Sequence, residues 1–71
     1  MAEIKYTILK KGQSLRTYDD GYPKGSYKNL NKDVKVEIEK SLIRYVLTIS
    51  VDGVIIIFNC TSFKIQEDPN E

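Results

Sequence analysis

Few side chains in this chain of 71 residues are suited to acid–base or nucleophilic chemistry. It contains no histidine and a single cysteine, Cys60. Among its close acidic pairs, Asp19 and Asp20 precede a glycine as in a turn, and Glu37 and Glu39 alternate with apolar residues. Carboxylates on the polar face of a strand stay hydrated and lack the desolvation that prepares an acid or base for catalysis. We therefore predict no catalytic residues and no enzymatic activity.

A metal or cofactor site is equally hard to build from these residues. With one cysteine and no histidine, neither an intramolecular disulfide nor a zinc site of Cys and His ligands can form. A calcium loop needs several oxygen ligands at alternating positions, and Asp19 and Asp20 supply only two. We predict no metal and no cofactor, and we interpret Cys60 as a small core side chain at the end of an apolar strand.

The strongest structural signal is a β-hairpin between Ile43 and Cys60, with Asp52-Gly53 at its turn. A two-residue type I′ turn requires positive φ at both central positions, which Gly adopts freely and Asp tolerates. This turn pairs Val51 with Val54, and side chains then alternate between the two faces. One face is apolar and is predicted to form the core: Tyr45, Leu47, Ile49, Val51, Val54, Ile56, Phe58 and Cys60.

The opposite face of this hairpin mixes polar residues with an apolar group, Val46, Ile55 and Ile57. A half-exposed strand does not require isoleucines on its solvent side. Two interpretations stay open. Another segment of the chain covers these residues, or they form an exposed patch that binds a protein, for which a second copy of the chain is the simplest cover. We count all three among the candidate partner-binding residues.

A second candidate surface lies in residues 19–31, DDGYPKGSYKNLN, where two glycines and a proline predict a long structured loop. Leu30 is expected to anchor its far end. Tyrosines are dense in and beside this loop, and such aromatic side chains either fix a loop to the core or face a ligand. The candidate partner-binding residues here are Tyr18, Asp19, Asp20, Tyr22 and Tyr27.

Binding of single-stranded nucleic acid is the alternative function. Small barrels stack bases on exposed aromatic side chains beside basic groups, and the three tyrosines lie close in sequence to Arg16, Lys24 and Lys28. Two aspartates in the same loop and a net charge of only +1 disfavour it, because phosphate binding needs a positive surface. Protein binding therefore ranks first.

Alternation of apolar and polar residues predicts further strands. Ile4, Tyr6 and Ile8 are expected to face the core from one strand, and residues 14–18 and 63–65 predict two shorter ones.

Residues 33–45 are ambiguous between strand and helix. Val34, Val36 and Ile38 recur with strand period, whereas Val34, Ile38, Leu42 and Tyr45 also fit helical spacing. The β-branched side chains at the three alternating positions favour a strand. Residues 39–42 are then expected to turn into the hairpin.

Together these segments predict an all-β fold: a small antiparallel SH3-like barrel of about five or six strands with one long loop. Residues 1–66 are expected to form this single domain. Residues 67–71 are acidic, contain a proline and predict a frayed C-terminal tail. A composition of 41% hydrophobic and 30% charged residues suits one globular domain.

The order of the segments resembles that of bacterial SH3-type domains over most of the chain. The matching parts are residues 14–17 (SLRT), a glycine-containing loop, residues 30–36 (LNKDVKV) and residues 51–54 (VDGV). The chain has no tryptophan where such domains usually carry one, and residues 56–58 replace a glycine and an aromatic residue. The resemblance therefore implies the fold and not the family's ligand groove.

Localisation follows from what the chain lacks. Its first residues show no signal-peptide pattern, and the longest apolar run, Val54 to Phe58, is too short to cross a bilayer. We expect a cytoplasmic protein without a membrane partner. The small size and the Lys/Ile/Asn-leaning composition suit a phage or mobile-element accessory protein that binds and modulates a host protein.

Overall fold

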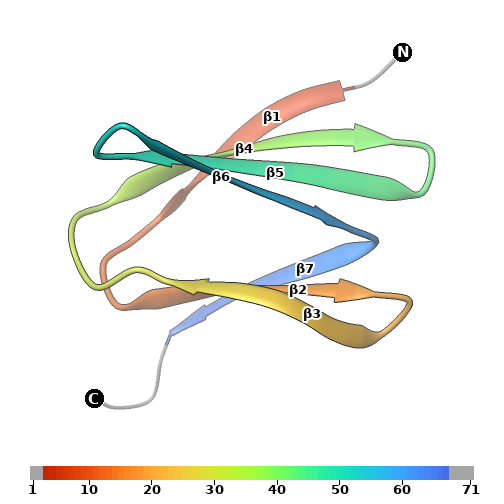
Figure 1. Cartoon of the computed structure of the whole chain (residues 1–71), viewed down its shortest axis with the longest axis horizontal. Coiled ribbons are helices and arrows are strands. Elements are labelled where there is room, and N and C mark those ends of the chain that lie inside the picture. The colour runs from red at the N-terminus through yellow and green to blue at the C-terminus, as the bar shows by residue number, and fades with distance from the viewer. Residues whose placement is uncertain (1–2, 68–71) are drawn as a thin grey trace.

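The computed structural model describes residues 3–67, which form seven strands in two antiparallel sheets (Figure 1). One sheet has the strand order β1-β4-β5-β6 and the other β3-β2-β7. The strands are β1 (Glu3–Leu9), β2 (Gln13–Asp19), β3 (Tyr22–Lys28), β4 (Val34–Ser41), β5 (Arg44–Val51), β6 (Val54–Cys60) and β7 (Ser62–Glu67).

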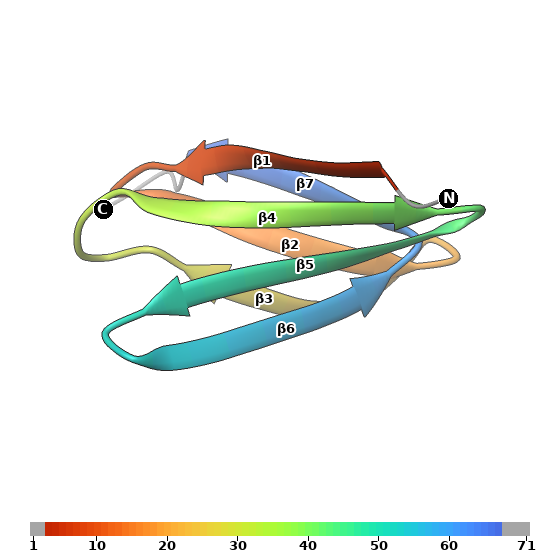
Figure 2. The ribbon, with the colours of Figure 1, turned by 90° about the horizontal axis from the view of Figure 1, so that it is seen from above.

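The all-β prediction is confirmed, whereas the closed barrel of five or six strands is wrong. The two sheets lie over one another as separate layers, and the chain passes between them after β1, β3 and β6 (Figures 1 and 2). No strand of the described residues belongs to both sheets, so the edges do not join into a barrel.

The central hairpin has the predicted register. Val51 pairs with Val54, and the pairing continues without a shift to Tyr45 opposite Cys60. Asp52 and Gly53 have φ values of 51° and 78°, the left-handed conformation that a type I′ turn requires. Local turn chemistry and alternation were therefore sufficient to place these two strands.

The core lies between the inner faces of the two sheets. Both sheets supply fully buried side chains, with Leu47 and Ile49 from β5 facing Leu15 from β2. At one end of this layer, Tyr45 and Phe63 pack edge to face with ring centroids 5.2 Å apart. The buried apolar residues are Leu9, Leu15, Val34, Val36, Leu47, Ile49 and Cys60.

The predicted long loop over residues 19–31 is wrong, because most of it is strand β3. Asp20 and Gly21 form a second tight turn, with φ values of 53° and 85°. The register of β3 against β2 shifts once, because Thr17 lies opposite Gly25 and Tyr18 opposite Pro23, which leaves Lys24 in a bulge. A proline and a bulge are compatible with β3 because it is an edge strand.

The orientation predicted for β1 is also wrong. Ile4, Tyr6 and Ile8 point away from the core and are 70%, 65% and 43% exposed. Leu9, on the other face of the strand, is fully buried and pairs with Val34. Alternation identified the apolar face of β1, but contact with the second sheet selects the face that carries Leu9.

Residues 33–45 are strand and not helix. They contain β4 and the start of β5, joined by a two-residue turn at Leu42 and Ile43, since Ser41 pairs with Arg44. The turn lies later than predicted, because residues 39–41 belong to β4 and only Leu42 of the predicted turn is in the observed one. Both apolar side chains at its tip are exposed, Leu42 at 97% and Ile43 at 75%.

The connection from β3 to β4 depends on Asn29 and not on Leu30. Leu30 is 72% exposed, whereas Asn29 is fully buried. The side-chain amide nitrogen of Asn29, Nδ2, donates hydrogen bonds to the backbone carbonyl oxygens of Leu9 at 2.8 Å and Lys32 at 3.0 Å. A buried amide with these partners holds three segments together, which a buried leucine cannot do.

The end of the chain contains β7, which includes the strand predicted at residues 63–65. Glu67 is the last residue of β7, and the other residues of the predicted tail, 68–71, lie outside the described residues.

Candidate protein-interaction surface

The face of the first sheet that points away from the core, called here the outer face, carries most of the exposed apolar side chains. Register places the side chains of its four strands in rows across the sheet. Apolar residues occupy both edges, and charged residues of β4 run between them. The outer face consists of Ile4, Tyr6, Ile8, Lys35, Glu37, Glu39, Val46, Thr48, Ser50, Ile55, Ile57 and Asn59.

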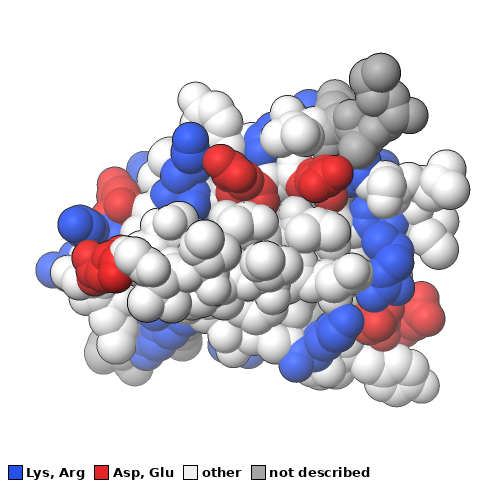
Figure 3. Space-filling view, turned by 45° about the horizontal axis from the view of Figure 1, so that its top comes forward, with Lys and Arg blue, Asp and Glu red and all other residues white. Residues whose placement is uncertain are grey.

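The structure shows whether another described segment covers the isoleucines of the hairpin. Ile55 is 65% exposed and Ile57 is 63% exposed, and Val46 beside them is half-buried. None of the residues 3–67 covers them. Figure 3 shows the result as a broad uncharged surface with acidic and basic side chains around it. An exposed apolar group of this kind marks an interaction surface more often than a plain solvent face.

A shallow hollow of about 260 Å³ lies on this face between β4, β5 and β6. Its lining joins the apolar side chain of Ile55 to polar groups: Lys35, Glu37, Thr48 and Ser50. Lys35 Nζ and Glu37 Oε2 lie 4.0 Å apart and form an exposed ion pair. Ligand pockets usually measure about 300 to 1,000 Å³. The hollow therefore suits one side chain of a protein partner better than a small molecule.

The predicted tyrosine cluster is dispersed in the structure. Tyr27 lies opposite Leu15 and packs against the core, whereas Tyr18 points to the other side of β2. Tyr22 is 75% exposed beside the Asp20-Gly21 turn. These three aromatic side chains do not share one contact surface.

Asp19 makes intramolecular contacts. Both of its carboxylate oxygens accept hydrogen bonds from the Arg44 guanidinium, at 3.3 and 3.2 Å, and Lys24 Nζ lies 3.6 Å away. The hydrogen bond from Arg44 is the main cause that lowers the pKa of Asp19, and the nearby charges act in the same direction. Because the pKa is lowered, this contact stabilises the fold at pH values above the ordinary Asp pKa of 3.8, and the stabilisation is lost as the pH falls through the lowered pKa.

The role of Asp19 is therefore to connect the two sheets. Arg44 lies in β5 and Asp19 in β2, and Arg44 Nε also donates to Asn59 Oδ1 at 2.7 Å. Sequence reasoning did not find Arg44, because a contact across 25 positions leaves no local pattern. Asp20 lies in the turn, where its backbone N–H donates to Thr61 Oγ1 at 2.8 Å.

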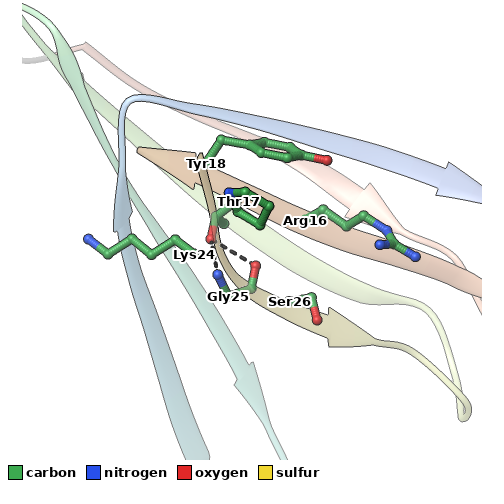
Figure 4. Close-up of a pocket in the computed structure, with 7 residues that line it drawn as sticks. Arg16, Thr17, Tyr18, Lys24, Gly25 and Ser26 are labelled. Carbon is green, nitrogen blue, oxygen red and sulfur yellow. Dashed lines mark hydrogen bonds between the residues drawn. The ribbon is translucent and has the colours of Figure 1, made fainter. Parts of the chain in front are cut away.

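The outer side of the second sheet is different in character. Arg16 on β2 lies opposite Lys64 on β7 and Ser26 on β3, and Tyr18 follows on the same side. A hollow of about 230 Å³ lies there, and its lining includes Arg16, Tyr18 and the bulged Lys24 (Figure 4). This side is basic and polar, and none of the side chains that the described strands present there is acidic.

The side chains with catalytic potential lie apart from one another. Cys60 is fully buried at the end of β6, and burial is the main cause that raises the pKa of its thiol, so the protonated form dominates at neutral pH. Glu37 and Glu39 are exposed on the outer face. Among residues 3–67 no group of three His, Cys, Asp or Glu side chains is placed to hold a metal ion.

No protein-family model, no curated protein and no solved structure matches this chain. The candidate surfaces therefore follow from this chain's own geometry. Within residues 3–67 no helix is long and apolar enough to cross a membrane.

Proposed function

We infer that this chain is a non-enzymatic module that binds another protein through the outer face of its four-stranded sheet. The observation that supports this inference is the exposure of Ile55 and Ile57, at 65% and 63%, beside a hollow that fits one side chain. Protein interfaces usually combine a buried apolar contact with polar and charged groups beside it, and here the charged residues of β4 lie beside the apolar group of β5 and β6. Ile55, Ile57 and Val46 would supply the buried contact, and the β4 charges would orient the partner.

The finer form of the proposal is a phage or mobile-element accessory protein that works in the cytoplasm and modulates a host protein. The small size and the Lys/Ile/Asn-leaning composition support such an accessory protein, and the free, buried thiol of Cys60 supports a reducing compartment. The sequence resemblance to SH3-type domains supports only the all-β scaffold of this proposal. The exposed side chains of the outer face form the proposed interacting surface, which is independent of that family's ligand groove.

Affinity capture from the native host with mass spectrometry, repeated with purified candidates, tests the proposal. The Ile55→Lys variant places a charge among the exposed apolar side chains of β6 and is expected to weaken binding of a captured protein by about tenfold or more. Lys64→Glu, on the opposite sheet, is the matched control and is expected to bind like the wild type. Equal binding by both variants would contradict the proposed surface.

Single-stranded nucleic acid is the second candidate partner, supported by the basic outer side of the second sheet. Arg16 and Lys64 lie opposite each other there, and Tyr18 offers an aromatic ring beside them. Such a site is expected to bind an oligonucleotide with strong salt dependence. Titration of a fluorescent single strand at low salt tests it, and Lys64→Glu is then the damaging variant and Ile55→Lys the control.

A further inference from the structure

The two sheets expose four strand edges, and three of them carry features that prevent pairing with another chain. On β3, Pro23 lacks an N–H donor and Lys24 forms a bulge. On β7, Lys64 and Glu67 place charges along the strand. On β1, Lys5 lies opposite the partly buried Ile38 and so presents a charge on the inward face.

The fourth edge, β6, has none of these features. Its sequence, VIIIFNC, contains no charge, no proline and no glycine. In Figure 2, β6 forms the outermost strand of its sheet, and no other labelled strand lies beyond it. A long, uncharged, apolar edge strand is a ready template for pairing with another strand.

The register shows which backbone groups of β6 are available. In a two-residue hairpin the pair next to the turn exchanges hydrogen bonds, and bonded pairs then alternate with non-bonded ones. Val54, Ile56 and Phe58 therefore bond to β5, whereas the N–H and C=O groups of Ile55 and Ile57 point outward. No hydrogen bond within residues 3–67 engages these outward groups of Ile55 and Ile57.

One outward group of β6 is already engaged. The carbonyl oxygen of Asn59 accepts a hydrogen bond from Lys24 Nζ at 2.5 Å. This contact confirms the direction of the alternate groups, and it closes the end of the edge nearest to β7. The free edge therefore extends from Val54 to Phe58.

We propose that β6 pairs antiparallel with β6 of a second copy of this chain, on a two-fold axis at Ile56. In this register the backbone of Ile55 in each copy forms two hydrogen bonds with the backbone of Ile57 in the other copy. Each copy therefore contributes two N–H groups and two C=O groups. Pairing shifted toward Asn59 would compete with Lys24, and pairing shifted toward Gly53 would shorten the overlap. The two four-stranded sheets become one continuous sheet across the dimer.

Charge favours a second copy in this place. Antiparallel pairing brings Asp52, at the turn of one copy, to the far end of β6 in the other. Lys24 and Arg44 lie at that end, both hydrogen-bonded to Asn59. The paired strands themselves contain no charge and meet without repulsion, and their isoleucine side chains form a row on the outer face. This inference rests on the proposed protein-binding function and names the first partner.

Sedimentation equilibrium in the micromolar range, with the full chain, tests the pairing. The wild type is expected to sediment with twice the mass of the chain. Ile57→Pro removes one outward N–H without breaking the bonds to β5 and is expected to give a folded monomer. Ile4→Pro is the matched control, because Ile4 lies on the outer edge of β1, and the dimer is expected to persist.

Amide hydrogen exchange of the wild type gives a second readout that needs no variant. The amides of Ile55 and Ile57 are expected to exchange more slowly as the protein concentration rises. A monomer at every concentration, or a dimer that Ile57→Pro leaves intact, overturns the pairing. A monomer that still binds a host protein through Ile55 overturns only this inference, whereas equal capture by the wild type and Ile55→Lys overturns the proposed function.

Discussion

Two hairpins in this chain turn on the same dipeptide, yet they are held together differently. Asp52-Gly53 joins β5 to β6, and Asp20-Gly21 joins β2 to β3, with all four residues at positive φ. The first hairpin has apolar arms in continuous register, whereas the second contains a proline, a glycine and a bulge. The same turn chemistry therefore supports both a core hairpin and an edge hairpin.

The difference lies in what the inward side chains do at the centre of each hairpin. In the first, Leu47 is fully buried opposite Phe58. In the second, Thr17 lies opposite Gly25 and donates to its carbonyl at 2.8 Å, while Thr17 Oγ1 accepts from its N–H at 3.0 Å (Figure 4). Phe58 fills the space above Gly25, where an added Cβ would lie 3.1 Å from its ring. At these central pairs, packing stabilises the first hairpin and side-chain hydrogen bonds stabilise the second.

The largest expected effect comes from the apolar hairpin. Leu47→Ala removes a fully buried side chain and is expected to lower the free energy of unfolding by about 2 to 5 kcal/mol. Urea denaturation followed by circular dichroism measures it. Val46→Ala, on the outer face of the same strand, is the control and should cost far less. Similar losses for both variants would mean that the core does not lie between the sheets.

A smaller effect is expected in the polar hairpin. Thr17→Val keeps the shape of the side chain but leaves both backbone groups of Gly25 without their partner, at a cost of about 1 to 3 kcal/mol in unfolding free energy. The same denaturation experiment measures it, with Ser26→Ala on the exposed side as control. A neutral or stabilising Thr17→Val would show that packing, and not hydrogen bonding, holds this hairpin too.

The smallest loss of stability is expected from substitutions of the two turn glycines. Gly53 and Gly21 have φ values of +78° and +85°, and an added Cβ would meet nothing within 4 Å at either position. Gly53→Ala and Gly21→Ala are therefore each expected to cost about 1 to 2 kcal/mol, from backbone conformation alone. Thermal unfolding of the two variants compares them. Clearly unequal losses would mean that the arms, and not the turns, set the cost.

The sequence alone was informative wherever adjacent residues carried the signal. Asp52-Gly53 and the alternation around it predicted the β5–β6 register and the inward Cys60, because turn conformation and strand period are local properties. Asp20-Gly21 was recognised as a turn but not as the turn of a hairpin, because Pro23 and Gly25 made its second arm look like a loop. An Asp-Gly pair between short arms was the signal that could have found β3.

The sequence identified the residues of the candidate surface but did not establish whether they are exposed. The pattern identified Ile55 and Ile57 as unusual on an outward face, yet exposure depends on whether a distant segment covers them. The contact between Arg44 and Asp19 joins residues in different sheets, and no spacing in the sequence announces it.

The amino-acid sequence by itself determined an all-β chain, the tight turn at Asp52-Gly53 and most of the side chains that this hairpin buries, although Val54, expected in the core, is 56% exposed. Tertiary structure alone decided that the strands form two sheets and not a closed barrel, and that β1 turns Leu9 inward and its larger apolar face outward. The reason is physical: φ preference and alternation act between neighbours in the chain. The assembly of sheets depends on which distant side chains fill the same space.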